Sequence, residues 1–310
     1  MPHTVVVGVD ADAASPAAVH WAAREAARHG GGLAVVHAAR GPARPREDVA
    51  PAGAGQDRSE RTVREALHVV RADHPGLPVT GRVASDSPVA ALLTAAAEAG
   101  VLVLGSHGVS GVTGFVTGSV SHRVVARSPR PVVLVRPGWT AADEHLPAAD
   151  GVAPEEIPAT PHRAVVLGLD VRHPCDELIG FAFDAARRRG TCLTVVHAFK
   201  VPHRPASDAS LVTTPAAPPP PVAGAEALAA AERAVSAALG PWCEKYPAVR
   251  VTRTVTEGRA ATALVRAAHD AGLLVVGRRT GGGRLGAHTG PVTHAVLHHA
   301  ACPVAVVPHV

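Results

Sequence analysis

The sequence predicts an α/β protein built from two similar domains, and three observations carry that prediction. Short runs of Val and Leu alternate with longer Ala-rich segments of helical periodicity. The apolar runs are uninterrupted, which is typical of strands buried on both faces of a parallel sheet. The whole pattern then occurs a second time. Each copy is therefore expected to form an open, doubly wound, Rossmann-like sheet of five parallel strands with helices on both faces.

The repeat is visible as pairs of related motifs. TVVVGVD at residues 4–10 returns as AVVLGLD at residues 164–170, an offset of 160. VLVLG at residues 101–105 returns as LLVVG at residues 273–277, an offset of 172. The second copy therefore carries 12 extra residues before its fourth strand. We place them in a Pro-rich insertion at about 201–224, which contains four consecutive prolines and is expected to be an irregular loop.

The elements of the first copy follow from the pattern in order. Strands are expected near residues 4–9, 33–38, 79–84, 101–104 and 132–135, and helices near residues 16–29, 57–73, 88–99 and 119–127. We expect domain 1 at residues 1–137 and domain 2 at residues 163–310. Residues 138–162, rich in Pro and acidic side chains, are expected to link them.

Composition narrows the function classes. The chain is 47% hydrophobic with a net charge of +4, and its Lys and Arg are scattered, so charge gives no case for nucleic-acid binding. No secretory signal or membrane span is visible, so membrane insertion is not expected. None of the four cysteines forms a CxxC pair, which makes a disulfide framework or zinc site unlikely and favours the cytoplasm.

A glycine-rich loop follows the fourth strand of the first copy. The apolar run ends at Gly105, Gly108 follows, and Gly118 and Ser119 open the next helical segment. Strand, glycine loop and helix start suit an anion, most often a phosphate, because the first N–H groups of a helix are unpaired and carry positive partial charge. A plain glycine-rich surface loop is the alternative.

The loop is not a Walker loop, because the lysine of GxxxxGK[ST] is missing and the first copy contains no lysine at all. Backbone N–H groups would therefore be the main anion ligands, helped by side-chain hydroxyls. Those hydroxyls belong to Ser106, Ser110, Thr113 and Ser119.

Two further residues lie at the carboxyl ends of neighbouring strands, where ligands of such sheets bind. Asp10 follows the first strand and offers a carboxylate to a ribose or base, or else it caps the first helix, which Ser15 would also do. Ala38 ends the second strand, where a small side chain leaves room for a flat base or simply packs.

These motifs resemble the universal stress protein family, in a tandem form that spans nearly the whole chain. The match to the G-x2-G-x9-G-[ST] signature of its ATP-binding members is complete in the first copy. The resemblance implies a HUP-type fold and binding of ATP, with or without Mg²⁺. The residues it implies for the nucleotide are Gly8, Val9, Asp10, Ala38, Gly105, Ser106, His107, Gly108, Ser110, Gly118, Ser119 and Val120.

The signature is damaged in the second copy. Thr280 replaces the second glycine, and Pro291 replaces the serine and removes a hydroxyl and an N–H. Three arginines enter the same loop and either bind phosphate or form a solvated basic loop. If this copy binds a nucleotide, its site residues are Gly168, Asp170, Ala198, Gly277, Arg278, Arg279, Arg284 and Gly290.

Nineteen histidines make chance pairs common, so His294 and His298 on the last helix are expected to be surface residues rather than metal ligands. His37 and His197 are expected to be satisfied core residues. No catalytic triad is recognisable, and we assign no catalytic residue and no metal ligand.

The sequence therefore predicts an adenine-nucleotide-binding regulator of the stress response, without fast turnover. A slow ATPase or adenylyl-handling enzyme, and a nucleotide-free scaffold for an unknown protein partner, remain alternatives. The fifth strand of each copy is an edge that needs a partner. As the resemblance implies, the two edges are expected to pair with each other, which makes the chain an intramolecular pseudo-dimer. Two such chains are then expected to form a homodimer.

Overall fold

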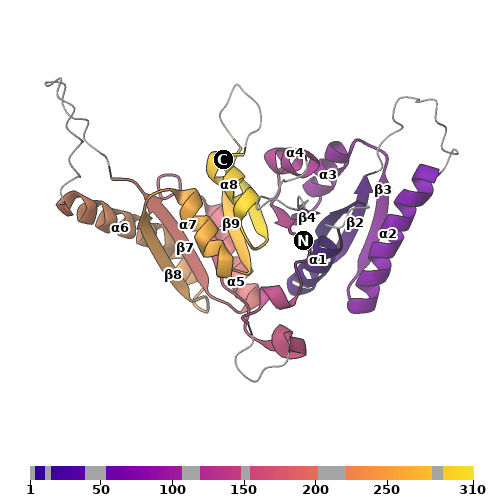
Figure 1. Cartoon of the computed structure of the whole chain (residues 1–310), viewed down its shortest axis with the longest axis horizontal. Helices are drawn as coiled ribbons and strands as arrows, with labels where there is room; N and C mark the ends of the chain where they lie inside the picture. The colour runs from indigo at the N-terminus through magenta and orange to yellow at the C-terminus, as the bar shows by residue number, and fades with distance from the viewer. Residues whose placement is uncertain are drawn as a thin grey trace.

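The computed structural model describes residues 4–10, 15–38, 54–106, 119–147, 154–201, 221–280 and 289–310. Within them the chain forms a single sheet of ten strands (Figure 1), in the order β3-β2-β1-β4-β5-β10-β9-β6-β7-β8. The first half contributes β1 (Val5–Val9), α1 (Ser15–His29), β2 (Leu33–Ala38), α2 (Ala54–Asp73), β3 (Val79–Ala84), α3 (Pro88–Ala97), β4 (Val101–Gly105), α4 (Ser119–Arg127) and β5 (Val132–Val135).

The second half repeats this order. It contains β6 (Val165–Gly168), α5 (Asp176–Arg189), β7 (Leu193–Phe199), α6 (Pro221–Lys245), β8 (Val251–Glu257), α7 (Ala260–Ala267), β9 (Leu273–Arg279), α8 (Pro291–His299) and β10 (Val304–His309). The predicted fold class and the alternation of strands and helices are confirmed. Helix α6 starts at Pro221, inside the stretch expected to be a loop, because proline suits the first turn of a helix.

Local signals explain where several helices begin and end. Ser87 caps α3, since its hydroxyl accepts from the Ala90 N–H at 3.4 Å, and Pro88 takes the first helical position. Gly30 and Gly190 follow α1 and α5 at positive φ (61° and 59°), a conformation that glycine adopts without strain. The two glycines are offset by 160 residues, so the repeat extends to the chain reversal after the first helix of each half.

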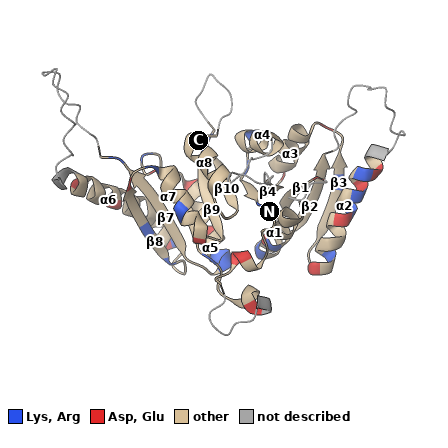
Figure 2. Ribbon diagram, in the orientation of Figure 1, with Lys and Arg blue, Asp and Glu red and all other residues tan. Residues whose placement is uncertain are grey.

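Two hydrophobic cores sandwich the sheet. One unites alternate strand residues such as Val7 and Leu167 with α1, α2, α5 and α6. The other unites their neighbours, such as Val6 and Val166, with α3, α4, α7 and α8. Side chains of successive strand residues point to opposite faces, so uninterrupted Val and Leu runs are what a sheet covered on both faces requires. Charged residues lie outside the cores, for example along α2 (Figure 2).

The two halves join at the edge strands. Within each half the strands are parallel, but β5 and β10 pair antiparallel, with Val133 opposite Ala305. Both residues are fully buried. The prediction that the two edges pair with each other is confirmed, and the pairing turns two five-stranded sheets into one continuous sheet.

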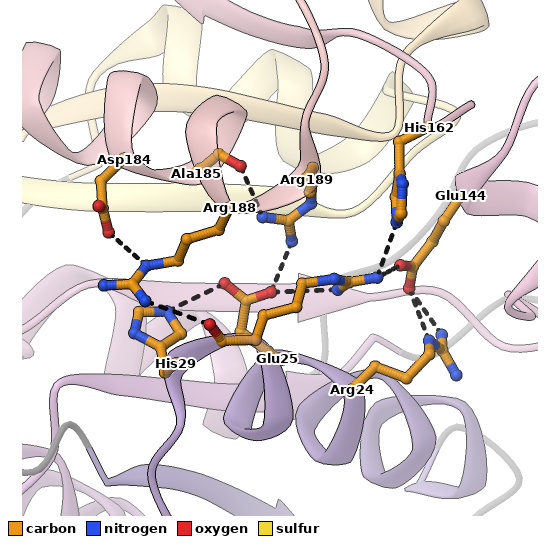
Figure 3. A network of polar contacts seen from close by, with 10 residues as sticks. Arg24, Glu25, His29, Glu144, His162, Asp184, Ala185, Arg188 and Arg189 are labelled. Carbon is orange, nitrogen blue, oxygen red and sulfur yellow. Dashed lines mark hydrogen bonds and ion pairs between the residues drawn. The ribbon is translucent and has the colours of Figure 1, made fainter. Parts of the chain in front are cut away.

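The segment between the halves is not a simple spacer. It holds two short 3-10 turns, η1 (Ala142–Glu144) and η2 (Pro154–Ala159), and Glu144 is 2% exposed. The Glu144 carboxylate accepts hydrogen bonds from Arg24, at 2.7 Å, and from Arg28 (Figure 3). The acidic side chains of the expected linker therefore include one, Glu144, that binds the segment to α1.

The same network ties α1 to the second half. Arg189 of α5 donates to Glu25 of α1 at 2.6 Å, and Arg188 donates to the Arg28 carbonyl at 3.2 Å (Figure 3). Burial opposes ionisation of Glu25, but Arg189, His29 and Arg28 outweigh it and hold the pKa of that carboxyl far below its usual range. Arginines and carboxylates from three segments therefore neutralise one another at the junction.

His162 should make the protein sensitive to mild acid. Burial and the neighbouring Arg28 lower the pKa of His162 from 6.5 to about 4, because Arg28 donates to its Nε2 at 3.2 Å and holds it neutral. Between pH 6.5 and 4 the unfolded chain binds the proton and the folded chain does not, so stability falls as the pH falls. We expect His162→Gln to lose less stability than wild type across this window, in urea titrations at fixed pH.

The matched control is His20→Gln. His20 is an exposed histidine that faces Asp73 at 3.1 Å. We expect the His20→Gln variant to keep a profile of stability against pH close to that of wild type. Parallel profiles for wild type and His162→Gln would contradict the role given to His162.

Candidate functional site

The first half has its topological switch point between β1 and β4. Strand β1 pairs with β2 on one side and with β4 on the other, so the strands that follow β1 in the chain lie on both sides of it in the sheet. A crevice forms outside the carboxyl ends of strands at such a point. Asp10 directly follows β1, Ala38 is the last residue of β2, and Gly105 ends β4. The structure therefore gathers the ends of three predicted segments at one edge of the sheet.

Asp10 and Ser15 hold each other at this edge. The Ser15 hydroxyl donates to the Asp10 carboxylate at 2.6 Å and accepts from the Asp10 N–H at 2.9 Å. Both readings from the sequence therefore meet here: Asp10 interacts with the start of α1, and it remains an exposed residue at the carboxyl end of β1. A carboxylate has about four acceptor sites and can accept hydrogen bonds from several donors at once.

The end of β4 is organised by hydroxyls. Ser106 is 4% exposed, and its side chain donates to the Val135 carbonyl at 3.2 Å instead of facing a phosphate. Ser121, in the first turn of α4, donates to the Gly105 carbonyl at 3.4 Å. In the second half Thr293 makes the equivalent bond to Gly277 at 3.0 Å. In both halves, therefore, a hydroxyl fixes the helix start to the strand end.

Glycine has a packing role at one predicted site residue. A Cβ on Gly8 would lie 2.6 Å from Leu104 and 2.7 Å from Leu92, so the absence of a side chain lets α3 and β4 pack closely. Val9 is buried in the core, and Val120 lies in the first turn of α4. The predicted residues His107, Gly108, Ser110, Thr113, Gly118 and Arg284 lie outside the described residues.

His37 and His197 are confirmed as satisfied histidines. The Nδ1 atom of His37 lies 2.8 Å from the Val9 carbonyl, and that of His197 lies 2.9 Å from the Leu169 carbonyl. A carbonyl only accepts, so each Nδ1 carries the proton. Each bond joins the ends of two neighbouring strands and so fixes the residue that follows, Asp10 or Asp170.

The second half contains a pocket of about 720 Å³ at the corresponding place. It lies at the carboxyl ends of β6, β7 and β9 and beside the start of α8. All the predicted second-half site residues within the described ranges line it: Gly168, Asp170, Ala198, Gly277, Arg278, Arg279 and Gly290. Apolar side chains such as Leu178 and Leu264 also line it, so the pocket combines an apolar wall with charged groups, as small-molecule sites do.

Asp170 differs from Asp10 in its surroundings. Its carboxylate accepts from Arg172 at 3.3 Å, His173 at 3.4 Å and Arg279 at 3.5 Å. Burial opposes ionisation, but hydrogen bonds from Arg172 and His173 outweigh it and lower the pKa of Asp170. Its acceptor sites are thus occupied by the protein's own cations, which leaves less capacity for a ribose hydroxyl.

The C-terminus enters the second pocket, which the sequence did not indicate. Strand β10 continues beside β9 as far as His309 opposite Arg279. A Cβ on Gly277 would lie 2.7 Å from the His309 Nε2, so the imidazole covers that glycine. Thr280, which replaces the second glycine of the signature, donates to the His309 carbonyl through its N–H at 2.7 Å and its hydroxyl at 2.9 Å.

Arg278 corrects one expectation. The sequence suggested it as a phosphate ligand, but its guanidinium is buried and donates to the Ser128 carbonyl of the first half at 2.5 Å. Arg278 lies near the junction of the two halves because β9 lies beside β10, and β10 lies beside β5. Arg279, the next residue, is half exposed and faces Asp170. The alternation of side chains along the strand separates the two arginines.

Two histidines of α8, His294 and His298, lie close to each other, and His294 also lies close to His122 of α4. The ring centroids of His294 and His298 are 4.4 Å apart, and those of His294 and His122 are 5.7 Å apart. Within the described part of the chain, no group of three or more His, Cys, Asp or Glu side chains is arranged to hold a metal ion. Every helix among the described residues is also too short or too polar to span a bilayer.

Comparison with known proteins gives the class of this fold and site. The family model for the universal stress protein family matches residues 1–136 and 161–308. Universal stress protein Rv2005c of Mycobacterium tuberculosis is 34% identical over 312 residues, covering 98% of this chain and 96% of that protein. The chain therefore belongs to the universal stress protein family.

A solved structure that covers 98% of this chain agrees on the fold. A universal stress protein from Archaeoglobus fulgidus matches with a TM-score of 0.66 over 98% of both chains, at 16% identity. A shorter universal stress protein, solved in complex with cAMP, matches 44% of this chain at 30% identity and a TM-score of 0.35.

Proposed function

We propose that the first half binds an adenine nucleotide, ATP with or without Mg²⁺, and that the chain acts as a nucleotide-dependent regulator in the stress response. One observation carries the proposal: β1 and β4 flank the switch point, with Asp10 after one strand and the intact glycine signature after the other. Asp10 would bind the ribose, Ala38 would adjoin the base, and backbone N–H groups from the glycine loop to α4 would bind the phosphates.

The same residues argue against fast hydrolysis. The first half has no lysine to reach the β- and γ-phosphates. Phosphoryl transfer depends on positioned cations and on a group that orients the attacking water. The bound nucleotide would instead favour one arrangement of the loop and α4. We place this activity in the cytoplasm, and propose that two chains pair through the pseudo-dimer.

Nucleotide binding can be tested by calorimetry at millimolar ATP, with and without Mg²⁺. We expect Gly118→Ala combined with Ser119→Ala to lower ATP affinity by at least about 10-fold, because each charge-assisted hydrogen bond contributes roughly 1.5–3 kcal/mol. Gly76→Ala is the control, since a Cβ there meets nothing within 4 Å. If wild-type protein binds no ATP, the proposal is wrong.

A nucleotide-free scaffold is the second candidate, favoured by the second half. There Asp170 is occupied by arginines, Pro291 removes a donor, and His309 covers Gly277. A partner protein that binds wild type and the Gly118→Ala/Ser119→Ala variant equally well would support this candidate.

A further inference from the structure

The cradle proposed for the phosphates depends on how α4 is held. Helix α4 runs from Ser119 to Arg127, and its first N–H groups would face the phosphates. At this end it is fixed within its own half, by the Ser121 hydroxyl on the Gly105 carbonyl. Its other end is held from outside that half.

Arg278 of the second half binds the C-terminal end of α4. Its Nη2 donates at 2.5 Å to the carbonyl of Ser128, the residue that follows the helix. Ser128 is 1% exposed and Arg278 is 5% exposed, so the bond is shielded from water. A cation at this end also complements the helix dipole, whose negative pole lies there.

Burying the charge of this arginine costs free energy, and its contacts must offset that cost. Desolvation lowers the pKa of the Arg278 guanidinium. Its partner, the Ser128 carbonyl, compensates a buried charge less fully than a carboxylate would. The equivalent residue in the first half is Ser106, whose hydroxyl stays within its own half on Val135. The contact is therefore one-sided: the second half holds the helix of the first.

A second contact acts on the middle of α4. The Thr289 hydroxyl lies 3.1 Å from the His122 Nε2, and Thr289 precedes Gly290, the N-cap of α8. The rings of His122 and His294 also meet edge to face, 5.7 Å apart. Helices α4 and α8 lie next to each other at the top of the molecule in Figure 1.

We infer that Arg278 is a positioning residue for the nucleotide site of the first half, so that this site is complete only with the second half in place. The inference rests on the proposed function and goes beyond it. The second half would then serve the first even where its own signature has been lost. Arg278 follows Gly277 of the degenerate signature on β9 and makes a contact between the two halves.

The test compares two probes, ATP and adenosine, by calorimetry on the full chain. Arg278→Ala should weaken ATP binding about tenfold, a typical coupling between sites, because α4 holds the phosphates. Adenosine binding should stay within about twofold, since Asp10 and Ala38 lie on strands that Arg278 does not touch. Arg278→Lys, which keeps a donor for Ser128, should recover part of the ATP affinity.

Arg188→Ala is the matched control. It also removes an arginine-to-carbonyl bond between the halves, from Arg188 to Arg28, but at the junction near α1. It should leave the ATP affinity unchanged. Thr289→Val, which deletes only the bond to His122, gives a milder variant if Arg278→Ala does not fold, and should weaken ATP binding without affecting adenosine.

Two results would overturn the inference: wild-type ATP affinity in folded Arg278→Ala and Thr289→Val, or equal loss of ATP and adenosine. If wild type binds no nucleotide, the proposed function fails, and hydrogen exchange still decides the positioning role. Amides of α4 should then exchange faster in Arg278→Ala than in Arg188→Ala, and equal exchange would contradict it.

Discussion

Replacing Val133 by aspartate should destabilise the protein by more than about 4 kcal/mol, the largest effect we expect from a single substitution. Val133 is the second residue of β5, fully buried and opposite Ala305 of β10. A carboxylate there would be desolvated, because Val133 belongs to a hydrophobic core of the sheet. Either the new side chain therefore takes up a proton, or β5 separates from β10.

The cost should depend on pH in a defined direction. Burial raises the pKa of the introduced aspartate, so the folded state binds a proton that the unfolded state releases at neutral pH. The stability difference from wild type should therefore narrow as the pH falls from 7 to 5. Urea denaturation followed by circular dichroism measures both the difference and its pH dependence.

Two control variants test whether the cost of Val133→Asp comes from burying a charge. Val133→Thr keeps the shape and adds one hydroxyl, and should cost about 1–3 kcal/mol. Val69→Asp places the same charge on α2 at a residue that is 38% exposed, and should cost less than about 1 kcal/mol. If Val133→Asp were as stable as Val69→Asp, β5 and β10 would not form the buried centre of the sheet.

Replacing Glu144 by glutamine should cost about 3–5 kcal/mol, the range found when one partner of a buried ion pair is removed. Glu144 lies between Arg24 and Arg28, so Arg24 would lose this carboxylate and Arg28 would keep only that of Glu25. Burial opposes ionisation of Glu144, but Arg28 and Arg24 outweigh it and lower its pKa. Its contribution is therefore present above the pKa of an ordinary glutamate and is lost as the pH falls through the lowered value.

A surface pair supplies the control for Glu144. Glu60 and Arg64 on α2 are 4.0 Å apart and exposed, so Glu60→Gln should cost no more than about 0.5 kcal/mol. The double variant Glu144→Leu/Arg28→Met should be less destabilised than Glu144→Gln, because it removes a buried charge together with its partner. Equal denaturation midpoints for Glu144→Gln and Glu60→Gln would show that the linker does not dock through this carboxylate.

The pattern of the chain predicted most of the fold because its signals are local. Val and Leu runs, Ala-rich helices and the repeat located strands to within a residue, as at β2 and β5. Helix ends were less exact: α2 starts at Ala54, three residues before the expected position. Composition could not show that Glu144 binds two arginines of α1, since its charge is the same whether it meets water or arginines.

The proposed nucleotide site shows the same division. Sequence alone determined the class of fold, the family, the intact signature of the first half and its loss in the second, because these depend on residue type and spacing along the chain. Only the tertiary structure decided that Arg278 holds α4, that His309 covers Gly277 and that arginines occupy Asp170. The physical reason is that the contacts of Arg278 with Ser128, of His309 with Gly277 and of Arg279 with Asp170 join residues more than 25 positions apart, which meet only because the sheet brings strand ends together.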